Sequence, residues 1–132
     1  MNLSVITPEK QLIEGAEVSE LIAPGIEGQL DVLPSHANFV TELETGVIKW
    51  KSGDSWTSAA LSYGWLEVNV DGAITILADV ADLGQKVDKT RAQKAKEKAL
   101  SKIEQGGLTD VDFAKYELKL LRADARLKAA NT

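Results

Sequence analysis

Hydrophobic and polar residues alternate through the first two thirds of the chain. Leu30 and Val32 alternate with Gln29 and Asp31, and Leu66, Val68 and Val70 share one face of a later run. A period of two predicts strands that are buried on one face. Turn residues recur every eight to twelve positions or so, with Asp71-Gly72 as the strongest hairpin signal. Short strands at this spacing predict a β-sandwich or flattened barrel.

The pattern also locates the individual strands. Extended runs are expected at residues 3–7, 11–14, 17–23, 29–32, 39–41, 47–50, 56–61, 65–70 and 73–78, with breaks at Gly15 and at Pro24-Gly25. Residues 79–86 are expected to form a seam that connects the sandwich to the last third of the chain. All three tryptophans lie in the strand-rich part, as expected if it carries the main core.

From Val87 onward the hydrophobic period becomes helical. Asp88 can cap a first helix, Gly106-Gly107 can end it in a left-handed conformation, and Thr109 can cap a second helix. The apolar stripes are Ala92, Ala95, Ala99 and Ile103 on the first helix, and Ala114, Leu118, Leu121 and Ala125 on the second. The sequence therefore predicts an antiparallel αα-hairpin.

Together these elements predict an α+β protein with two units, a β-sandwich over residues 1–84 and a helical hairpin over residues 85–132. Alanine favours helices but buries little area, so the hairpin gains little by closing on itself. Fewer than fifty residues are too few for a separate core. We expect the hairpin to dock weakly on another surface and to be able to undock.

Charge divides the chain at the same place. Residues 1–84 hold three lysines against 13 carboxylates, a net charge of −10, whereas residues 85–132 hold 12 cations against seven carboxylates, a net charge of +5. Such asymmetry favours two units with different partners. The basic unit has only Phe113 and Tyr116 as aromatic residues, so a nucleic-acid partner is not expected, and an acidic protein surface fits it better.

Composition excludes several classes of chemistry. The chain has no cysteine, and its single histidine, His36, excludes the multi-histidine zinc sites. It has no G-x-x-x-x-G-K-[ST] loop, no apolar run that could span a bilayer and no leader pattern at its start. We expect no catalytic residue, no metal and no required cofactor. A hydrolase built on a pair of carboxylates is the enzymatic alternative.

Four segments in order resemble one family. The stretch Gly25-Ile26-Glu27-Gly28-Gln29-Leu30-Asp31-Val32-Leu33-Pro34-Ser35-His36-Ala37 carries the most specific motif, and it is accompanied by Val5-Ile6-Thr7-Pro8-Glu9, Gly64-Trp65-Leu66-Glu67-Val68 and Ile74-Thr75-Ile76-Leu77-Ala78-Asp79. With the helical tail, these segments resemble the ε subunit of rotary F-type ATP synthases over nearly the whole chain.

The resemblance implies a non-catalytic rotor subunit. Its sandwich would lie beside the γ subunit at the foot of the central stalk, against the c-subunit ring, with Glu27, Gln29 and His36 facing the rotor. The hairpin would be a regulatory arm that reaches the catalytic α and β subunits and impedes ATP hydrolysis. The protein would be peripheral to the cytoplasmic face of a bacterial plasma membrane, or to the stromal or cytoplasmic face of a thylakoid.

The start of the hairpin is similar to the family's nucleotide motif [IL]-D-x-x-R-A. The matching residues are Val87, Asp88, Arg91 and Ala92, and in family members that bind ATP this segment meets arginines that correspond to Arg122 and Arg126. The resemblance therefore implies ATP as a regulatory ligand. A free-standing nucleotide-sensing module is the alternative function.

Each of these residues also has a structural interpretation. Asp88 suits a helix N-cap, and the two arginines suit the dipole near a helix C-terminus. His36 suits a turn in which it bonds backbone groups. The lysines Lys94, Lys96 and Lys98 suit a solvated helix face, or a contact with an acidic segment of the β subunit.

Overall fold

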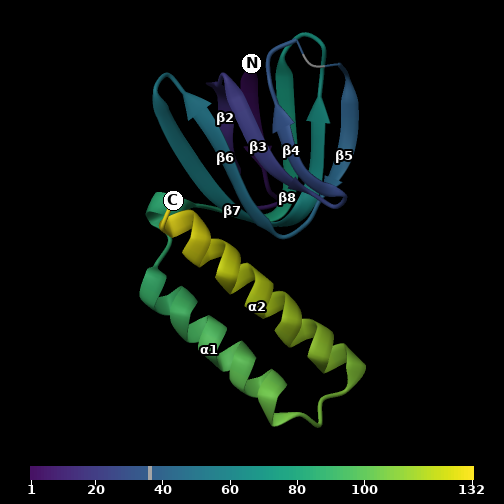
Figure 1. Ribbon diagram of the computed structural model, residues 1–132, viewed down its shortest axis with the longest axis vertical. Coiled ribbons are helices and arrows are strands. Elements are labelled where there is room, and N and C mark those ends of the chain that lie inside the picture. The colour runs from purple at the N-terminus through teal and green to yellow at the C-terminus, as the bar shows by residue number, and fades with distance from the viewer. Residues whose placement is uncertain (36) are drawn as a thin grey trace.

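The computed structural model describes residues 1–35 and 37–132 as a β-sandwich with two α-helices at one end (Figure 1). In these residues the strands come first and the helices last. The elements are β1 (Asn2–Ile6), β2 (Gln11–Glu17), β3 (Glu20–Gly25), β4 (Gly28–Val32), β5 (Phe39–Leu43), β6 (Gly46–Ser52), β7 (Ser55–Val68), β8 (Ala73–Leu83), the 3-10 helix η1 (Gly84–Lys86), α1 (Lys89–Gln105) and α2 (Asp110–Ala130). The predicted α+β class is confirmed.

The long strand β7 joins the two layers of the sandwich. The strand order is β2-β1-β8-β7-β5-β3-β4, and β6 pairs with both β3 and β7. The first half of β7 pairs with β6, its second half pairs with β5, and β8 runs along its other edge. All pairings among the described strands are antiparallel except that of β1 with β8. Because β7 changes partner midway, the sheet folds over and encloses a core.

The core between the layers is built by strand residues and their connections. Its fully buried large side chains are Leu3, Leu21, Leu43, Ile48, Leu61, Leu66, Ile74 and Ile76, with Val5, Val32 and Val68. No described residue of α1 or α2 belongs to this cluster. The sandwich therefore buries its apolar area without help from the helices, which is what an independently stable unit requires.

Three strands extend further than the sequence pattern indicates, the first being β7, which runs unbroken over Ser55–Val68 where separate runs at 56–61 and 65–70 were expected. Gly15, expected to break a strand, instead has φ 62° inside β2, where the register against β1 shifts as in a β-bulge. Residues 79–83, expected in the seam, belong to β8, and Asp82 pairs with Ala60 of β7. Alanine and aspartate have low strand propensity, so pairing with the distant β7 decides this segment.

The tryptophans are not all in the core. Trp50 is buried, but Trp56 and Trp65 are each about half exposed. Trp65 lies on the outer face of β7, directly opposite Leu77 of β8, which is also half exposed. Alternation along β7 places this tryptophan outside because Leu66, its neighbour, fills the core.

The ends of both helices agree with the sequence. The Asp88 side chain accepts a hydrogen bond from the backbone N–H of Arg91 at 3.0 Å, and Thr109 Oγ1 accepts one from Asp112 at 3.1 Å. Gly106 and Gly107 both have φ 71°, so the connection uses the left-handed region that glycine adopts readily. The predicted caps and helix end are confirmed.

The interface between the two helices is built largely from alanines. Ala92 and Ala99 of α1 and Ala123 of α2 are buried, and Lys96 Nζ forms an ion pair with Asp124 Oδ1 at 3.0 Å. The predicted stripe of α2 is wrong for Ala114 and Leu121, which are exposed. The buried face of α2 instead follows Ala123, Ala125 and Ala129 because this helix must meet both α1 and the sandwich.

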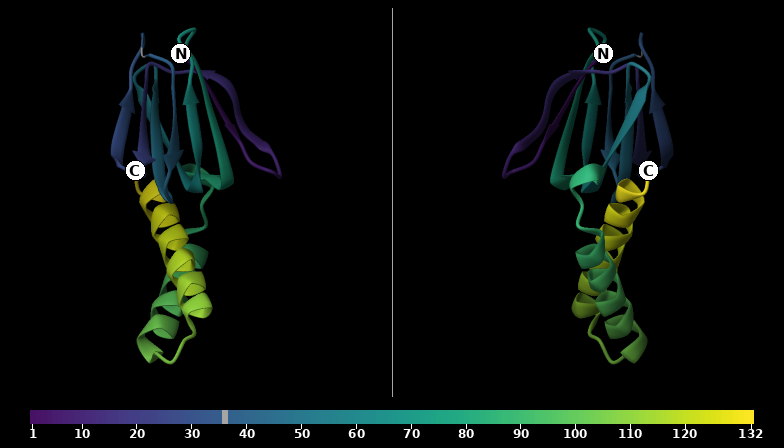
Figure 2. Two further views of the ribbon diagram at one scale, coloured as in Figure 1. Left: turned by 90° about the vertical axis from the view of Figure 1, so that its right-hand side faces the viewer. Right: turned by 90° about the vertical axis from the view of Figure 1, so that its left-hand side faces the viewer.

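The C-terminal half of α2 docks on the lower end of the sandwich (Figure 2). The apolar part of this contact is small, with Ala125 and Ala129 against Ala60 and a partly buried Val47. The buried Ser58 hydroxyl donates a hydrogen bond to the Ala129 carbonyl at 2.8 Å. A Cβ on Gly84 would lie 2.2 Å from that same carbonyl oxygen, so glycine permits the close approach.

The close approach of β7 and β8 at Gly64 yields a stability prediction. A Cβ at Gly64 would lie 2.0 Å from the Leu77 carbonyl oxygen, so Gly64→Ala must displace the β7–β8 ladder. We expect a loss of roughly 1–3 kcal/mol in the free energy of unfolding, measured by urea denaturation of the full chain.

Ser55→Ala is the matched control because it adds no atoms at the exposed start of the same strand. It should change the free energy of unfolding by less than about 0.5 kcal/mol. Equal effects of the two substitutions would contradict the close-approach argument.

Candidate functional site

The first turn of α1 carries the predicted nucleotide segment. Val87 follows η1 in extended conformation, Asp88 is the N-cap, and Arg91 is exposed one turn into the helix. The capping bond occupies one Asp88 oxygen with the backbone of its own helix. The helix-cap interpretation of Asp88 is therefore confirmed.

The two arginines of α2 contact the sandwich. Arg122 donates from Nε to Ser62 Oγ at 2.6 Å and from Nη2 to Asp79 Oδ2 at 3.1 Å. Arg126 donates from Nε to Asp82 Oδ2 at 3.1 Å. Both guanidinium groups are about one-third exposed, so each ion pair contributes little on its own. The sequence suggested that both arginines interact with the dipole near a helix C-terminus. The structure instead gives them side-chain partners on β7 and β8.

A cavity of about 630 Å³ opens between the two helices and the sandwich. All six predicted nucleotide residues line it: Val87, Asp88, Arg91, Ala92, Arg122 and Arg126. The other lining residues are Asp82, Lys86, Ala95, Lys98, Ala99, Tyr116 and Lys119. Its volume lies within the range typical of small-molecule sites.

The electrostatics of the cavity favour an anion. Six of its lining residues are cations and two, Asp82 and Asp88, are carboxylates. Because Arg126 donates to Asp82 through Nε, the donors on its two Nη atoms can bond a further acceptor in the cavity. The arrangement can hold a polyphosphate by charge-assisted hydrogen bonds.

Sequence reasoning missed several residues in and around this cavity. Asp79, Asp82 and Ser62 come from strands far away in sequence, so no local spacing could place them beside the arginines. Tyr116, Lys119 and Arg122 follow one another on α2 at intervals of three residues, so each is a neighbour of the next on the helix surface. That interval is visible in the sequence and would have found them.

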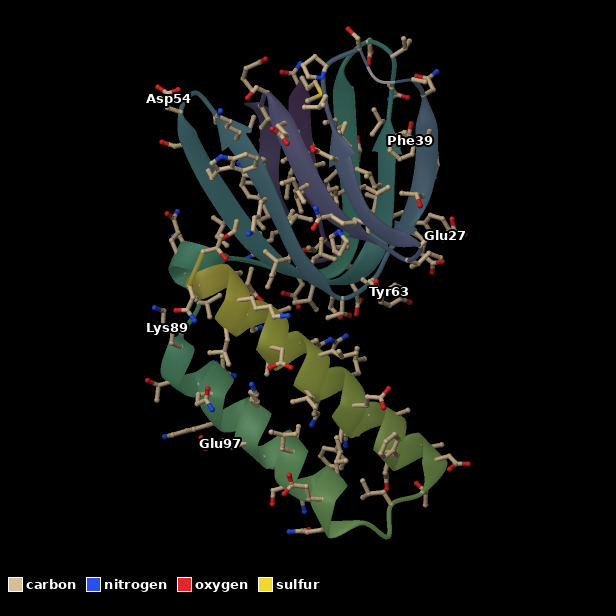
Figure 3. The ribbon with its side chains drawn as sticks, in the orientation of Figure 1. Glu27, Phe39, Asp54, Tyr63, Lys89 and Glu97 are labelled. Carbon is tan, nitrogen blue, oxygen red and sulfur yellow. The ribbon has the colours of Figure 1, made fainter. Side chains whose placement is uncertain are left out.

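Two of the three predicted rotor residues lie just before β4 and within it, Glu27 and Gln29. Glu27 is exposed in the β3–β4 turn, at the end of the sandwich that bears the hairpin, and Gln29 is exposed on β4 (Figure 3). His36 lies outside the described residues. β4 runs from this turn toward the opposite end of the sandwich, so Glu27 and Leu33 are separated by a full strand.

One carboxyl pair bears on the hydrolase alternative. A side-chain hydrogen bond with Asp31 raises the pKa of Glu20 above its usual value, with desolvation and the charge of Asp31 acting in the same direction. The two groups lie on neighbouring strands and do not line the cavity between the helices and the sandwich. A substrate held in that cavity would therefore not reach them.

The described residues also bear on metal and membrane binding. They contain no cluster of three or more His, Cys, Asp or Glu side chains that could hold a metal ion. Within the same residues, no helix combines the length and the apolar character needed to cross a bilayer.

Known proteins with similar sequences cover nearly the whole chain. Residues 1–84 match the family model described as "ATP synthase, Delta/Epsilon chain, beta-sandwich domain", and residues 85–131 match "ATP synthase, Delta/Epsilon chain, long alpha-helix domain". The ATP synthase epsilon chain of Bdellovibrio bacteriovorus is 36% identical, covering 98% of this chain and 94% of the relative. That of Moorella thermoacetica is 40% identical, covering 98% and 96%.

Solved structures show the same fold. A chain of the Euglena gracilis mitochondrial ATP synthase aligns with a TM-score of 0.84 and 22% identity, over 100% of this chain and 81% of that one. A chain in the central stalk and c-ring structure of the Tetrahymena thermophila enzyme aligns with a TM-score of 0.63 and 20% identity, over 100% and 96%. Both family models match, and the relatives align over nearly their whole length. This chain therefore belongs to the delta/epsilon family of ATP synthase subunits, as a non-catalytic epsilon chain.

Proposed function

We propose that this epsilon chain acts in the central stalk as a rotor subunit whose helical hairpin regulates ATP hydrolysis. The observation that carries the proposal is the contrast between a sandwich with a complete core and a hairpin held by a small, mostly polar contact. In this proposal residues 1–84 hold the subunit in the rotor, and residues 85–132 form the arm that moves.

The outer face of the sandwich carries exposed apolar side chains that suit a permanent protein partner. Trp65 and Leu77 are half exposed side by side, and Val40 of β5 is about two-thirds exposed on the strand next to β7. Apolar side chains gathered on one face of a sheet are typical of a protein interface. The γ subunit is the partner we propose for this face, and the c-ring is the partner proposed for Glu27, Gln29 and His36.

The location follows from the assembly. As part of a membrane-bound ATP synthase, the chain would be peripheral to the membrane, on the cytoplasmic face of a bacterial plasma membrane or the stromal or cytoplasmic face of a thylakoid. The hairpin would reach the α and β subunits when it leaves the sandwich.

The cavity supports ATP as the ligand that keeps the hairpin folded. Val87, Asp88, Arg91 and Ala92 at the start of the hairpin and the two arginines of α2 line the same space, so one polyphosphate would bridge both helices. A ligand that binds only the folded arrangement stabilises it increasingly as its concentration rises. No cofactor is required for the fold in this proposal.

A free-standing nucleotide-sensing module is the second candidate, since the cavity belongs to this chain alone. Purification of the protein from its own membrane separates the two. Co-elution with α, β and γ supports the rotor subunit, whereas a monomer that binds ATP outside any complex supports the module.

Calorimetry tests the nucleotide site. Arg126→Ala removes guanidinium donors from the cavity, so the affinity for ATP should fall by about 10-fold or more, as expected for charge-assisted bonds of roughly 1.5–3 kcal/mol. Lys128→Ala removes a cation from the exposed side of the same helix and should leave the affinity unchanged. Absence of heat with the unsubstituted chain would remove the sensing role.

Truncation tests whether the sandwich and the hairpin have the separate roles proposed above. Deletion of the residues after Gln85 leaves the whole sandwich core in place, so the assembled complex should keep its coupling while its ATP hydrolysis becomes faster. Hydrolysis and proton pumping by membrane vesicles provide the measurement. If the truncated subunit no longer binds γ, the sandwich is not the rotor unit.

Hydrogen exchange tests the ion pairs that dock α2. The double variant Asp79→Asn/Asp82→Asn removes both pairs, each partly exposed and contributing about 0.2–1 kcal/mol. Amide exchange in α2 should become roughly 2- to 30-fold faster.

Asp54→Asn serves as the control because it removes a carboxylate of the sandwich at an exposed turn away from the hairpin (Figure 3). It should leave exchange in α2 unchanged. Equal exchange in the double variant and the unsubstituted chain would mean that the pairs do not hold the hairpin.

A further inference from the structure

An apolar stripe crosses the outer face of the sandwich at right angles to its strands. Trp65 of β7 lies directly opposite Leu77 of β8, and Leu77 lies directly beside Ile6 of β1. The first two side chains are about half exposed, and Ile6 is half-buried. Register partners on neighbouring strands lie close together on one face of a sheet, so the three residues form one continuous apolar surface.

Three carboxylates of the sandwich lie beside this stripe. Glu42 of β5 is the register partner of Trp65. Glu67 comes two residues after Trp65 on β7, so both side chains point to the same side of the sheet. Asp79 has the same relation to Leu77 on β8. The described strands β1, β5, β7 and β8 contain no lysine or arginine, so this face is complementary to a surface with an apolar centre and a basic rim.

One of these carboxylates also holds the hairpin. Asp79 Oδ2 accepts a hydrogen bond from Arg122 Nη2 of α2 at 3.1 Å. The Asp79 side chain is 56% exposed, whereas that of Arg122 is 28% exposed. The carboxylate is therefore open to a second cation from the solvent side, about 7 Å along β8 from Leu77. Asp79 thus belongs both to the rim of the stripe and to the contact between the sandwich and the hairpin.

A single carboxylate cannot hold both cations equally well. Asp79 carries one negative charge, so a second cation bound to it would lie close to the Arg122 guanidinium and repel it. Arg122 would keep its neutral partner, the Ser62 hydroxyl oxygen, which lies 2.6 Å from Nε. The hairpin would then be held less tightly, but this step alone would not release it.

The second ion pair of α2 takes no part in this competition. Asp82 pairs with Arg126 and lies opposite Ala60, which belongs to the apolar contact with α2. The Asp82 side chain therefore faces the hairpin and not the stripe. Both pairs have a distance of 3.1 Å and are partly exposed, so the Asp82 pair is an internal control for the Asp79 pair.

We propose that the stripe takes a partner surface with an apolar centre and a basic rim, and that a cation of this partner competes with Arg122 for Asp79. The inference rests on the γ subunit as the partner proposed above for this face. Binding of the partner weakens the docking of α2, and by linkage the docked hairpin weakens binding of the partner by the same factor. One aspartate thereby couples assembly of the rotor to release of the arm.

The test measures binding of the full chain to an assembly of α, β and γ subunits that lacks an epsilon chain, in buffer without nucleotide. Arg122→Gln frees Asp79, so the dissociation constant should fall roughly two- to fivefold, the size of one partly exposed ion pair. Asp79→Asn should raise it by a similar factor, and addition of Arg122→Gln to that variant should change nothing further. Biolayer interferometry gives the dissociation constants, and circular dichroism verifies that each variant is folded.

Asp82→Asn is the matched control because it removes the other ion pair of α2 and leaves Asp79 paired with Arg122. It should leave the dissociation constant unchanged. An equal gain in affinity from Arg122→Gln and Asp82→Asn would assign the effect to general loosening of the hairpin and overturn the inference. A gain from Arg122→Gln that persists in the Asp79→Asn background would overturn it too.

Trp65→Ala separates this inference from the proposed partner face. It removes the largest apolar group of the stripe, so the dissociation constant should rise by about 10-fold or more if γ covers this face. An unchanged constant would mean that γ binds elsewhere, and the face itself would fail together with the competition. If Trp65→Ala weakens binding but Arg122→Gln does not strengthen it, the face stands and the competition is wrong.

Discussion

The contact between α2 and the lower end of the sandwich is the interaction on which the rest of the arrangement depends. Its apolar part is a few methyl groups around Ala60, Ala125 and Ala129, each contributing about 0.8 kcal/mol. Its polar part is the Ser58 hydrogen bond to Ala129, the Arg122 hydrogen bond to Ser62 and two partly exposed ion pairs. The sum is a few kcal/mol, set against the freedom that the hairpin gains on leaving. A contact of this size can fix one arrangement without making it permanent, as the proposed movable arm requires.

Local sequence predicted the ends of the helices and the strands that bury alternate residues. Asp88, Thr109 and Gly106-Gly107 act on neighbours within a turn, so their effect needs no tertiary information. The extension of β8 to Leu83 and the exposure of Trp65 could not be predicted in this way, because both depend on pairing between β7 and β8. The residues of the candidate site also fall into a group that local sequence predicts and a group that it cannot predict. Its helical residues follow from a motif and from spacing, but Asp79, Asp82 and Ser62 reach the arginines only through the fold.

The arginines would connect docking with the proposed ligand binding. Arg122 and Arg126 use Nε, and Arg122 also one Nη, for the sandwich, so part of each guanidinium remains for a phosphate. A ligand held by these remaining groups and by α1 would not need to break the docking bonds. It would add bonds that exist only while both helices lie against the sandwich. Binding and docking would then be linked, and each would strengthen the other.

The charge asymmetry of the chain affects the balance between the docked and the proposed extended position of the hairpin. The sandwich carries a net charge of −10 and the hairpin +5, so the hairpin is attracted to its own sandwich before any specific bond forms. Lys96 forms an ion pair with Asp124, whereas Lys94 and Lys98 are exposed on α1. In the proposed extended position the arm would leave an acidic body, so its new partner must supply comparable negative charge to replace that attraction. Acidic surfaces would then compete for one set of cations, and the position of the arm would depend on ionic strength as well as on ATP.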